Sequence, residues 1–363
     1  MKWAATFLVF ALWALTVRAE GLAASQGNLR LTRMAGGFDV PWAIGFLPDG
    51  SFLVTERRGR LIQVRDGVKT RIKGVPRVAA QGQGGLLDVL VPRDFARTRE
   101  IFLTYSKHQG HGAGTAVARG ILARGSTRLE DVQVIFEAAP SSTTGRHFGS
   151  RLAETPDGTL FVSLGERGQR ESAQNLGLQQ GSIIRISRDG SVPADNPFLN
   201  HLSAKPEIWS FGHRNPQGMA FDAQGRLWAV EHGARGGDEV NLIRKGRNYG
   251  WPVISYGTHY SGRKIGEGTA KPGMEQPAFY WDPSIAPSGL MVYSGTLWPA
   301  WRGHVFIGSL KFDYISRLSG SPLKERERLE GPETGRIRDV REAPDGSIWF
   351  ASETEGAVFR LSR

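Results

Sequence analysis

The sequence contains no cysteine among its 363 residues. A disulfide framework, a thiolate metal site and a cysteine nucleophile are therefore excluded. The stability of such a protein has to come from side-chain packing, from bound metal ions, or from a fold that closes on itself.

Several sequence signatures are absent as well. The chain has no G-x-S-x-G nucleophile elbow, no H-E-x-x-H zinc motif, no P-loop and no Rossmann fingerprint. Its formal net charge is +11, yet it has no long run of Lys and Arg, since residues 324–328 (KERER) alternate in sign. Such scattered charge does not fit nucleic-acid binding and favours anionic ligands or acidic partners.

The single long apolar run lies at the N-terminus. Residues 3–17 are almost wholly apolar and follow Lys2. This run is shorter than the about 20 residues that a membrane-spanning helix needs. The pattern predicts a secretory signal peptide over residues 1–24, cleaved near residue 19 or 24, with an uncleaved anchor as the alternative. We therefore expect a mature protein without a membrane span that is periplasmic or secreted.

The chain does contain a repeated sequence pattern, in which turn residues are followed by a short apolar strand and then by a polar residue. Clear copies begin at residues 47–50 (LPDG), 155–158 (TPDG), 222–225 (DAQG) and 343–346 (APDG), and weaker copies cover residues 92–107 and 298–311. Pro, Asp and Gly favour turns, and the residues that follow them favour strands. Six copies predict an all-β, six-bladed β-propeller with four-stranded blades, formed by residues 25–363 as one domain. A β-sandwich is the alternative.

The ends of the repeats indicate how such a propeller closes and where its site lies. Residues 28–34 and 357–361 alternate like edge strands, and pairing them in one blade removes the exposed edges. We expect the repeat strands to be innermost, so that their polar ends form a ligand or metal site at the channel mouth; a solvated rim is the alternative. These polar ends are Glu56, Lys107, Glu166, Glu231, His232, Lys311 and Glu353.

Two polar loops are candidate binding segments. Residues 81–88 (QGQGGLLD) place Gln83 beside flexible backbone, and residues 212–218 (GHRNPQG) concentrate hydrogen-bond donors that include Arg214 and Asn215. An arginine offers a planar fork for carboxylates or carbonyls. Each loop taken alone is also compatible with a plain polar connection.

A histidine lies just before the third of the six repeat strands. Residues 145–152 (GRHFGSRL) contain His147. Histidine is suited to proton abstraction near neutral pH. When His147 is considered without its neighbours, the alternative is a purely structural role.

The segment after the fourth repeat strand has the composition of a calcium site. Residues 231–241 (EHGARGGDEVN) are rich in glycine and carboxylates, and Tyr249 follows Glu239 by ten residues. Backbone carbonyls and carboxylate oxygens are the ligands of hard cations such as calcium. The spacing is not that of an EF-hand.

Three cations are expected on two neighbouring blades. Lys311 ends the fifth repeat strand, and Arg336 and Arg338 alternate along a later strand, so that both point to one side. Together they could hold a polyanionic ligand. A surface strand with two arginines is the alternative.

The order of these segments resembles the soluble PQQ-dependent sugar dehydrogenases, and most of all their periplasmic aldose sugar dehydrogenase branch. The resemblance extends from about Leu31 to Leu361 and rests on the succession QGQGGLLDV, HFGSRL, GHRNPQG, EHG, GGDEVNLI, NYGWP, PSIAPSG, GSLK and RIRDV. It implies two cofactors, pyrroloquinoline quinone (PQQ), which is a tricarboxylated quinone, and Ca²⁺.

The resemblance also implies roles for individual residues. His147 corresponds to the general base that takes the proton of the anomeric hydroxyl while hydride passes to the quinone, and Arg214 polarises the quinone oxygens. The carbonyls of Gly233 and Ala234 would bind the active-site calcium, and Glu239 and Tyr249 match a second, structural calcium site. The positions that match cofactor contacts are Gln83, Arg214, Asn215, Lys311, Arg336 and Arg338. The aromatic residue over the cofactor is expected to be Tyr260, with Tyr280 and Trp281 as alternatives.

Three departures from the family pattern bear on sugar specificity more than on the cofactor. Arg146 stands where the glucose dehydrogenases have aspartate, Ala234 replaces a proline, and Glu166 replaces an aspartate. We expect an aldose substrate, a lactone product, an external quinone or cytochrome as electron acceptor, and a monomer or homodimer. A calcium-dependent propeller lactonase would not need the three cations. A non-catalytic binding propeller would not need a histidine opposite a metal.

Overall fold

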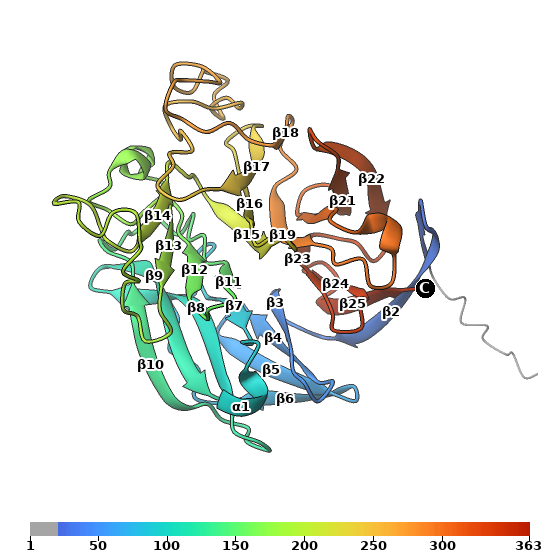
Figure 1. The fold of residues 1–363 in the computed structure, drawn as a ribbon. Coiled ribbons are helices and arrows are strands. Elements are labelled where there is room, and N and C mark those ends of the chain that lie inside the picture. The colour runs from blue at the N-terminus through green and yellow to red at the C-terminus, as the bar shows by residue number, and fades with distance from the viewer. Residues whose placement is uncertain (1–20) are drawn as a thin grey trace, which may run out of the picture.

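The computed structural model describes residues 21–363 and shows six antiparallel sheets arranged as blades around a central axis (Figure 1). The prediction of a six-bladed β-propeller is confirmed. Of the predicted signal peptide, residues 1–20 lie outside the described residues. Within the part of the chain that is described, no helix is long and apolar enough to cross a membrane.

Each of the first five blades is built from four consecutive strands. Blade 1 contains β3 (Pro41–Phe46), β4 (Phe52–Glu56), β5 (Arg60–Arg65) and β6 (Val68–Ile72). Blade 2 contains β7 (Leu86–Leu90), β8 (Glu100–Gln109), β9 (Gly112–Ile121) and β10 (Glu130–Glu137), with the short α1 (Phe95–Thr98) between the first two. Blade 3 contains β11 (Leu152–Glu154), β12 (Leu160–Ser163), β13 (Ser182–Ile186) and β14 (Ile208–Phe211). Blade 4 contains β15 (Pro216–Phe221), β16 (Leu227–Glu231), β17 (Asp238–Ile243) and β18 (Phe279–Trp281). Blade 5 contains β19 (Pro287–Val292), β20 (Val305–Ser309), β21 (Tyr314–Ser319) and β22 (Lys324–Glu330).

Blade 6 joins the two ends of the described chain. It contains β23 (Ile337–Glu342), β24 (Ile348–Ser352) and β25 (Ala357–Ser362), followed by β2 (Gly27–Gly36) and β1 (Gly21–Ala24). In the antiparallel pair of β2 and β25, Leu31 lies opposite Leu361, and Figure 1 shows the blue β2 beside the red β25. The predicted pairing of residues 28–34 with 357–361 is therefore confirmed.

The turns that open the repeats have the predicted chemistry. In the first turn, Gly50 has a φ of 81°, and Asp49 Oδ1 accepts a hydrogen bond of 3.1 Å from the backbone N–H of Ser51. The last turn repeats this arrangement, since Gly346 has a φ of 78° and Asp345 Oδ1 accepts from the N–H of Ser347 at 3.0 Å. Each turn reverses the chain between the first and second strands of its blade.

The predicted position of the repeat strands, innermost in each blade, is wrong. The repeat strands are β4, β8, β12, β16, β20 and β24, and each lies second from the axis. The first strands β3, β7, β11, β15, β19 and β23 are innermost, because they contact one another around the axis. Each blade begins with its innermost strand, and the turn and the repeat strand follow. The polar ends of the repeat strands therefore lie beside the channel mouth, one strand farther from the axis than predicted.

The core consists of apolar layers between neighbouring blades. Leu53 and Leu61 of blade 1, for example, pack with Leu87 and Leu103 of blade 2, and all four are at most 2% exposed. Because each sheet is covered on both faces, strands such as β4 and β13 are buried along their whole length. This packing supplies the stability that a chain without cysteine needs.

The strand β1 has no counterpart in the predicted repeat. Its Leu22 is only 2% exposed and belongs to the apolar cluster of blades 5 and 6, and β1 also contacts β22 of blade 5. Next to it, the N–H of Ser25 donates to Glu327 Oε2 at 2.8 Å. Cleavage near residue 24 would remove this strand, so we propose that the signal peptide is cleaved near residue 19.

The exported protein is therefore expected to begin at about residue 20, which N-terminal sequencing measures. In that protein, Leu22→Ala should lower the free energy of unfolding in urea by about 2 kcal/mol, because it removes a buried leucine. The exposed neighbour Gln26→Ala is the control and should leave the stability unchanged. A mature N-terminus at Ser25 would contradict the proposal.

Candidate active site

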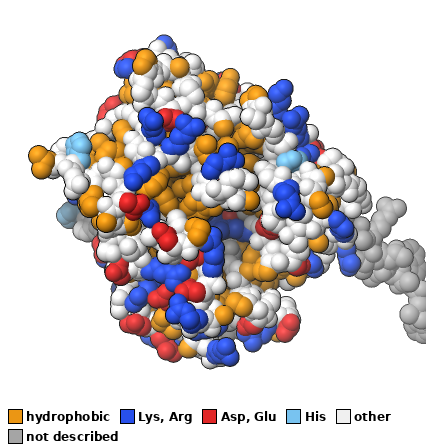
Figure 2. All heavy atoms as spheres, viewed as in Figure 1, with side chains coloured by type: hydrophobic (Ala, Val, Ile, Leu, Met, Phe, Trp, Pro, Cys, Tyr) orange, Lys and Arg blue, Asp and Glu red, His pale blue; other side chains and the backbone are white. Residues whose placement is uncertain are grey.

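A cavity of about 550 Å³ lies at the mouth of the central channel. Its size falls in the range of small-molecule sites. Figure 2 shows a hollow near the centre of this face with Lys and Arg side chains around it. All six blades contribute to its lining, which consists of Trp42, Arg57, Gln83, Leu87, Phe148, Gly149, Asn215, Gln217, His232, Ala286, Leu310, Lys311, Asp313, Arg336 and Arg338.

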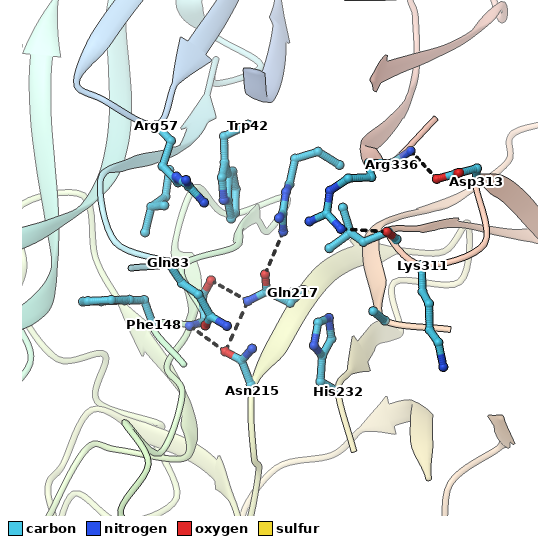
Figure 3. Close-up of a pocket in the computed structure, with 15 residues that line it drawn as sticks. Trp42, Arg57, Gln83, Phe148, Asn215, Gln217, His232, Lys311, Asp313 and Arg336 are labelled. Atoms are coloured by element: carbon cyan, nitrogen blue, oxygen red, sulfur yellow. Dashed lines mark hydrogen bonds between the residues drawn. The ribbon is translucent and has the colours of Figure 1, made fainter. Parts of the chain in front are cut away.

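One wall of the cavity carries the three predicted cations. Arg336 and Arg338 share one carboxylate, since their Nε atoms lie 3.1 Å from Glu353 Oε2 and 2.6 Å from Glu353 Oε1. Burial acts to raise the pKa of Glu353, but the charges of Arg338 and Arg336 lower it. Lys311 lies on the same wall (Figure 3). The sequence therefore identified a wall with more positive than negative charge.

The innermost surface of the cavity adjoins a network of ion pairs between the innermost strands. Arg151 is fully buried, and its Nη1 lies 3.1 Å from Asp88 Oδ1 and 3.0 Å from Asp339 Oδ1. Arg341 contacts the same two carboxylates, at 2.7 Å and 2.9 Å. The network reaches the cavity through Gln217, whose backbone carbonyl accepts from Arg151 Nε at 2.9 Å.

Gln217 also connects this network to the walls. Its Oε1 accepts from Arg338 Nη1 at 3.2 Å, and its Nε2 donates to Asn215 Oδ1 at the same distance. Asn215 Oδ1 also accepts from the N–H of Gly149 at 3.1 Å (Figure 3). The loop of residues 212–218 therefore fixes blades 3, 4 and 6 relative to one another at the site.

His147 lies beside the cavity with one ring nitrogen already paired. Its Nδ1 forms a short hydrogen bond with Glu166, and its backbone N–H donates to Gln83 Oε1 at 2.7 Å. The tight approach needs a glycine, because a Cβ at Gly165 would lie 2.0 Å from the carbonyl oxygen of His147. Pairing at Nδ1 leaves Nε2 as the nitrogen available to a substrate.

The surroundings of His147 keep its ring neutral near pH 7. Burial lowers the pKa of His147, and this effect and the nearby charge of Arg214 outweigh the hydrogen bond to Glu166, which acts in the opposite direction. A neutral imidazole can accept a proton, whereas an imidazolium cannot. The geometry therefore fits a base that is oriented by a carboxylate.

Arg214 points toward a second, smaller cavity under the 231–239 turn. Its Nη1 donates to the carbonyl of His232 at 3.3 Å, and its guanidinium lies 5.3 Å from the centre of the Trp251 ring. This cavity is also lined by the predicted metal ligands Gly233, Glu239 and Tyr249, whereas Ala234 follows Gly233 in the same turn.

The donor set of this turn consists of oxygen atoms. Burial and the charge of Glu231 raise the pKa of Glu239, so a cation between these carboxylates would be stabilising. The hydroxyl of Tyr249 is engaged, since it donates to the carbonyl of Leu242 at 2.6 Å and accepts from the N–H of Arg244 at 2.8 Å. Among residues 21–363, no group of three or more His, Asp and Glu could hold a metal ion, so a site here needs backbone carbonyls.

Comparison with known proteins agrees with this geometry. The model of the glucose/sorbosone dehydrogenase family matches residues 38–360. The chain belongs to this family. The aldose sugar dehydrogenase YliI of Escherichia coli K12 is 42% identical to it over 97% of this chain and 98% of the relative. The resemblance found in the sequence motifs is thereby confirmed, and the protein is an oxidoreductase of the sugar dehydrogenase type.

Solved structures extend the match to the fold. The crystal structure of the soluble aldose sugar dehydrogenase from E. coli in its apo form has a TM-score of 0.89 at 41% identity, and covers 92% of this chain and 99% of that one. The PQQ-bound aldose sugar dehydrogenase from Streptomyces coelicolor has a TM-score of 0.77 at 26% identity, and covers 92% and 98%.

In this sugar dehydrogenase, Tyr260, the aromatic residue expected over the cofactor, does not line the cavity. Tyr260 is 74% exposed on the long excursion between β17 and β18, at the top of Figure 1. Tyr280 stacks on Tyr256 with ring centres 4.1 Å apart, and Trp281 Nε1 donates to Glu325 Oε1 at 3.3 Å. The aromatic rings that line the cavity belong to Trp42 and Phe148.

Two residues that line the cavity carry no signal in the sequence, and a third is marked only by its position at the end of a repeat strand. Trp42 lies in an ordinary apolar strand, and Arg57 lies in the charged segment of residues 56–60 (ERRGR). His232 follows directly after β16 and lines both cavities, and its Nε2 donates to the carbonyl of Pro287 at 2.6 Å. Burial and the charge of Arg214 lower the pKa of His232 to about 3, so it stays neutral.

Proposed function

We propose that this protein oxidises aldose sugars at the anomeric carbon to lactones, with PQQ and Ca²⁺ as cofactors. The observation that carries the proposal is the presence, at one cavity, of a wall with three cations and a neutral histidine paired with a carboxylate. A lactonase would use a metal and the channel but would have no need of the cation wall. The export expected from the N-terminus, an external electron acceptor, and a monomeric or homodimeric state belong to the same proposal.

The residues present fit both cofactors. PQQ carries three carboxylates, and Lys311, Arg336 and Arg338 would hold them, with Gln83, Asn215 and Arg214 as further contacts. Arginine is well suited to this because its guanidinium pairs with a carboxylate through two parallel hydrogen bonds. For calcium, the carbonyls of Gly233 and Ala234 would serve the active site, and Glu239 and Tyr249 a structural site.

The chain's own residues supply the rest of the chemistry. Bound PQQ would accept the hydride that leaves C1, and bound calcium would supply Lewis-acid chemistry there. His147 Nε2 takes the proton of the anomeric hydroxyl as the C1 hydride leaves with its electron pair, so that C1 becomes the carbonyl carbon of the lactone. Glu166 holds the ring through Nδ1 and stabilises the imidazolium that forms. Arg214 would favour the negative charge that develops on the acceptor oxygens.

Reconstitution tests this proposal. Purified protein titrated with PQQ in the presence of Ca²⁺ should show a change in quinone absorbance and should reduce an electron-accepting dye when glucose or another aldose is added. With a calcium chelator present before PQQ is added, the activity should stay near background. The proposal is refuted if PQQ and Ca²⁺ together give neither the absorbance change nor sugar-dependent dye reduction.

Removing one cation of the wall should weaken cofactor binding. Charge-assisted hydrogen bonds contribute about 1.5–3 kcal/mol, so Arg338→Gln should raise the Kd for PQQ by about 10- to 100-fold, measured by titrating tryptophan fluorescence. Arg328→Gln, on the outer strand β22 and half exposed, is the matched control. Equal affinities in the two variants would count against the assignment of Arg338.

A further inference from the structure

A fourth cation, Arg57, lines the active-site cavity on the side away from Lys311 and Arg336. Figure 3 shows it beside Trp42 and above Gln83, whereas Arg336, Asp313 and Lys311 lie on the other side. It directly follows β4 of blade 1, while Lys311 and Arg336 belong to blades 5 and 6. Arg57 is not one of the three cations to which the proposed function assigns the carboxylates of PQQ.

The backbone of Arg57 is held firmly at this place. Its N–H donates to the carbonyl of Val40 at 3.1 Å, and its carbonyl accepts from the N–H of Leu86 at 2.9 Å. The close approach of the neighbouring loop depends on Gly85, where an added Cβ would lie 1.8 Å from the carbonyl oxygen of Arg57. The same loop carries Gln83, which binds the backbone of His147, so Arg57 lies on the side of the cavity where the base is held.

Its guanidinium has no carboxylate partner, although its neighbours have one. Arg58 Nε lies 3.3 Å from Asp39 Oδ2, and Arg60 pairs with Glu56. Arg57 forms no ion pair or side-chain hydrogen bond with any residue in the range 21–363, although it is half-buried. A cation that is partly withdrawn from water without a partner is unfavourable, and an anion bound beside it would offset this.

A second unpaired cation lies next to the base. Arg146 is exposed, and its side chain runs along Gly168, where an added Cβ would be 3.4 Å from Arg146 Cδ. Its charge contributes to lowering the pKa of His147, so its guanidinium is near the ring. Within the described residues, it too forms no ion pair. Two arginines without ion pairs therefore lie on the side of the cavity that carries the base, where the one carboxylate described, that of Glu166, pairs with His147.

We propose that the preferred substrate is an aldose with an anionic group, either the carboxylate of a uronic acid or the phosphate of an aldose phosphate, and that Arg57 binds this group. The inference rests on the proposed sugar oxidation and narrows its substrate class. A guanidinium binds either anion through two parallel hydrogen bonds. Arg146, which is exposed, attracts the same anionic group. Salt screens this attraction more strongly than it screens the half-buried contact with Arg57.

The test compares kcat/KM of the reconstituted protein for glucose, glucuronate and glucose 6-phosphate. We expect at least one anionic sugar to exceed glucose by about tenfold or more, and the better of the two identifies the anion. Arg57→Gln should lower the ratio of anionic to neutral kcat/KM by about tenfold or more, through KM. The control is Arg58→Gln, whose side chain faces Asp39 and is 74% exposed, and it should keep the wild-type ratio.

A binding measurement separates this inference from the proposed reaction. Methyl β-glucuronide and methyl β-glucoside lack a free anomeric hydroxyl, so their calorimetric affinities for the PQQ-loaded protein do not depend on turnover. The glucuronide should bind more tightly, and Arg57→Gln should remove the difference. If glucose is oxidised but neither anion is preferred, the inference fails and the proposed function stands. If the preference in binding is present but no aldose is oxidised, the proposed function fails and the anion site stands.

Discussion

His147→Gln is expected to lower kcat by about 10²- to 10⁴-fold, the range that general-base catalysis contributes. The loss should appear in kcat because the proton moves to Nε2 only in the reaction itself. Binding of PQQ should persist, since the contact with Gln83 is made by the backbone N–H of residue 147, which the substitution retains. Dye reduction at saturating sugar measures the first effect, and the PQQ titration the second.

The pH dependence provides a second measurement on the same residue. Because the pKa of His147 is lowered by burial, kcat/KM of the wild type should fall only below an apparent pKa that is less than 6.5. In Glu166→Gln the hydrogen bond that raises the pKa is weakened, so the acid limb should move to lower pH while kcat falls. His201→Gln, on an exposed loop, is the control. Full activity in His147→Gln would refute the role as base.

Asp339→Asn should lower the free energy of unfolding by about 3–5 kcal/mol, because it leaves two arginines of the channel network with one carboxylate instead of two. Arg151 lies between Asp88 and Asp339, and its side chain is 2% exposed, so water cannot replace the lost charge. Burial acts to raise the pKa of Asp339, yet Arg151 and Arg341 lower it. Urea unfolding of the cofactor-free protein measures the loss.

A surface ion pair serves as the control for this network. Asp195 pairs with Arg185 at 2.8 Å but is 65% exposed, so Asp195→Asn should cost less than about 1 kcal/mol. The lowered pKa of Asp339 also means that its contribution is present above its unfolded pKa and is lost as the pH falls through the folded one. The stability of Asp339→Asn should therefore fall less steeply on acidification than that of the wild type. Equal losses in the two variants would show that burial of the network is unimportant.

The number of blades could be predicted from the sequence, but the order of strands within a blade could not. Proline, aspartate and glycine mark each turn by local conformational preference, so copies can be counted without knowledge of tertiary contacts. The distance of a strand from the axis does not produce a comparable sequence pattern. The inner β3 and the second strand β4 are both apolar and almost wholly buried, because both are covered on two faces.

The site was predictable where chemistry coincides with a rare residue pattern. Arg336 and Arg338 lie on either side of Ile337 at the start of β23, and this alternation makes them conspicuous. Arg57 lies among other charges that do face solvent, so only the structure distinguishes it from Arg58. Tyr260 could not be placed, because the excursion between β17 and β18 has no hydrophobic periodicity that would fix its register.

The network of Arg151, Asp88, Asp339 and Arg341 also bears on how molecules reach the cavity. The side chains of Arg151, Asp88 and Asp339 are at most 2% exposed beneath the cavity, so we expect molecules to enter it from its open face. Under the proposed function, we then expect a sugar and an electron acceptor to use the same opening, one after the other. Departure of the oxidised sugar would then have to precede arrival of the acceptor.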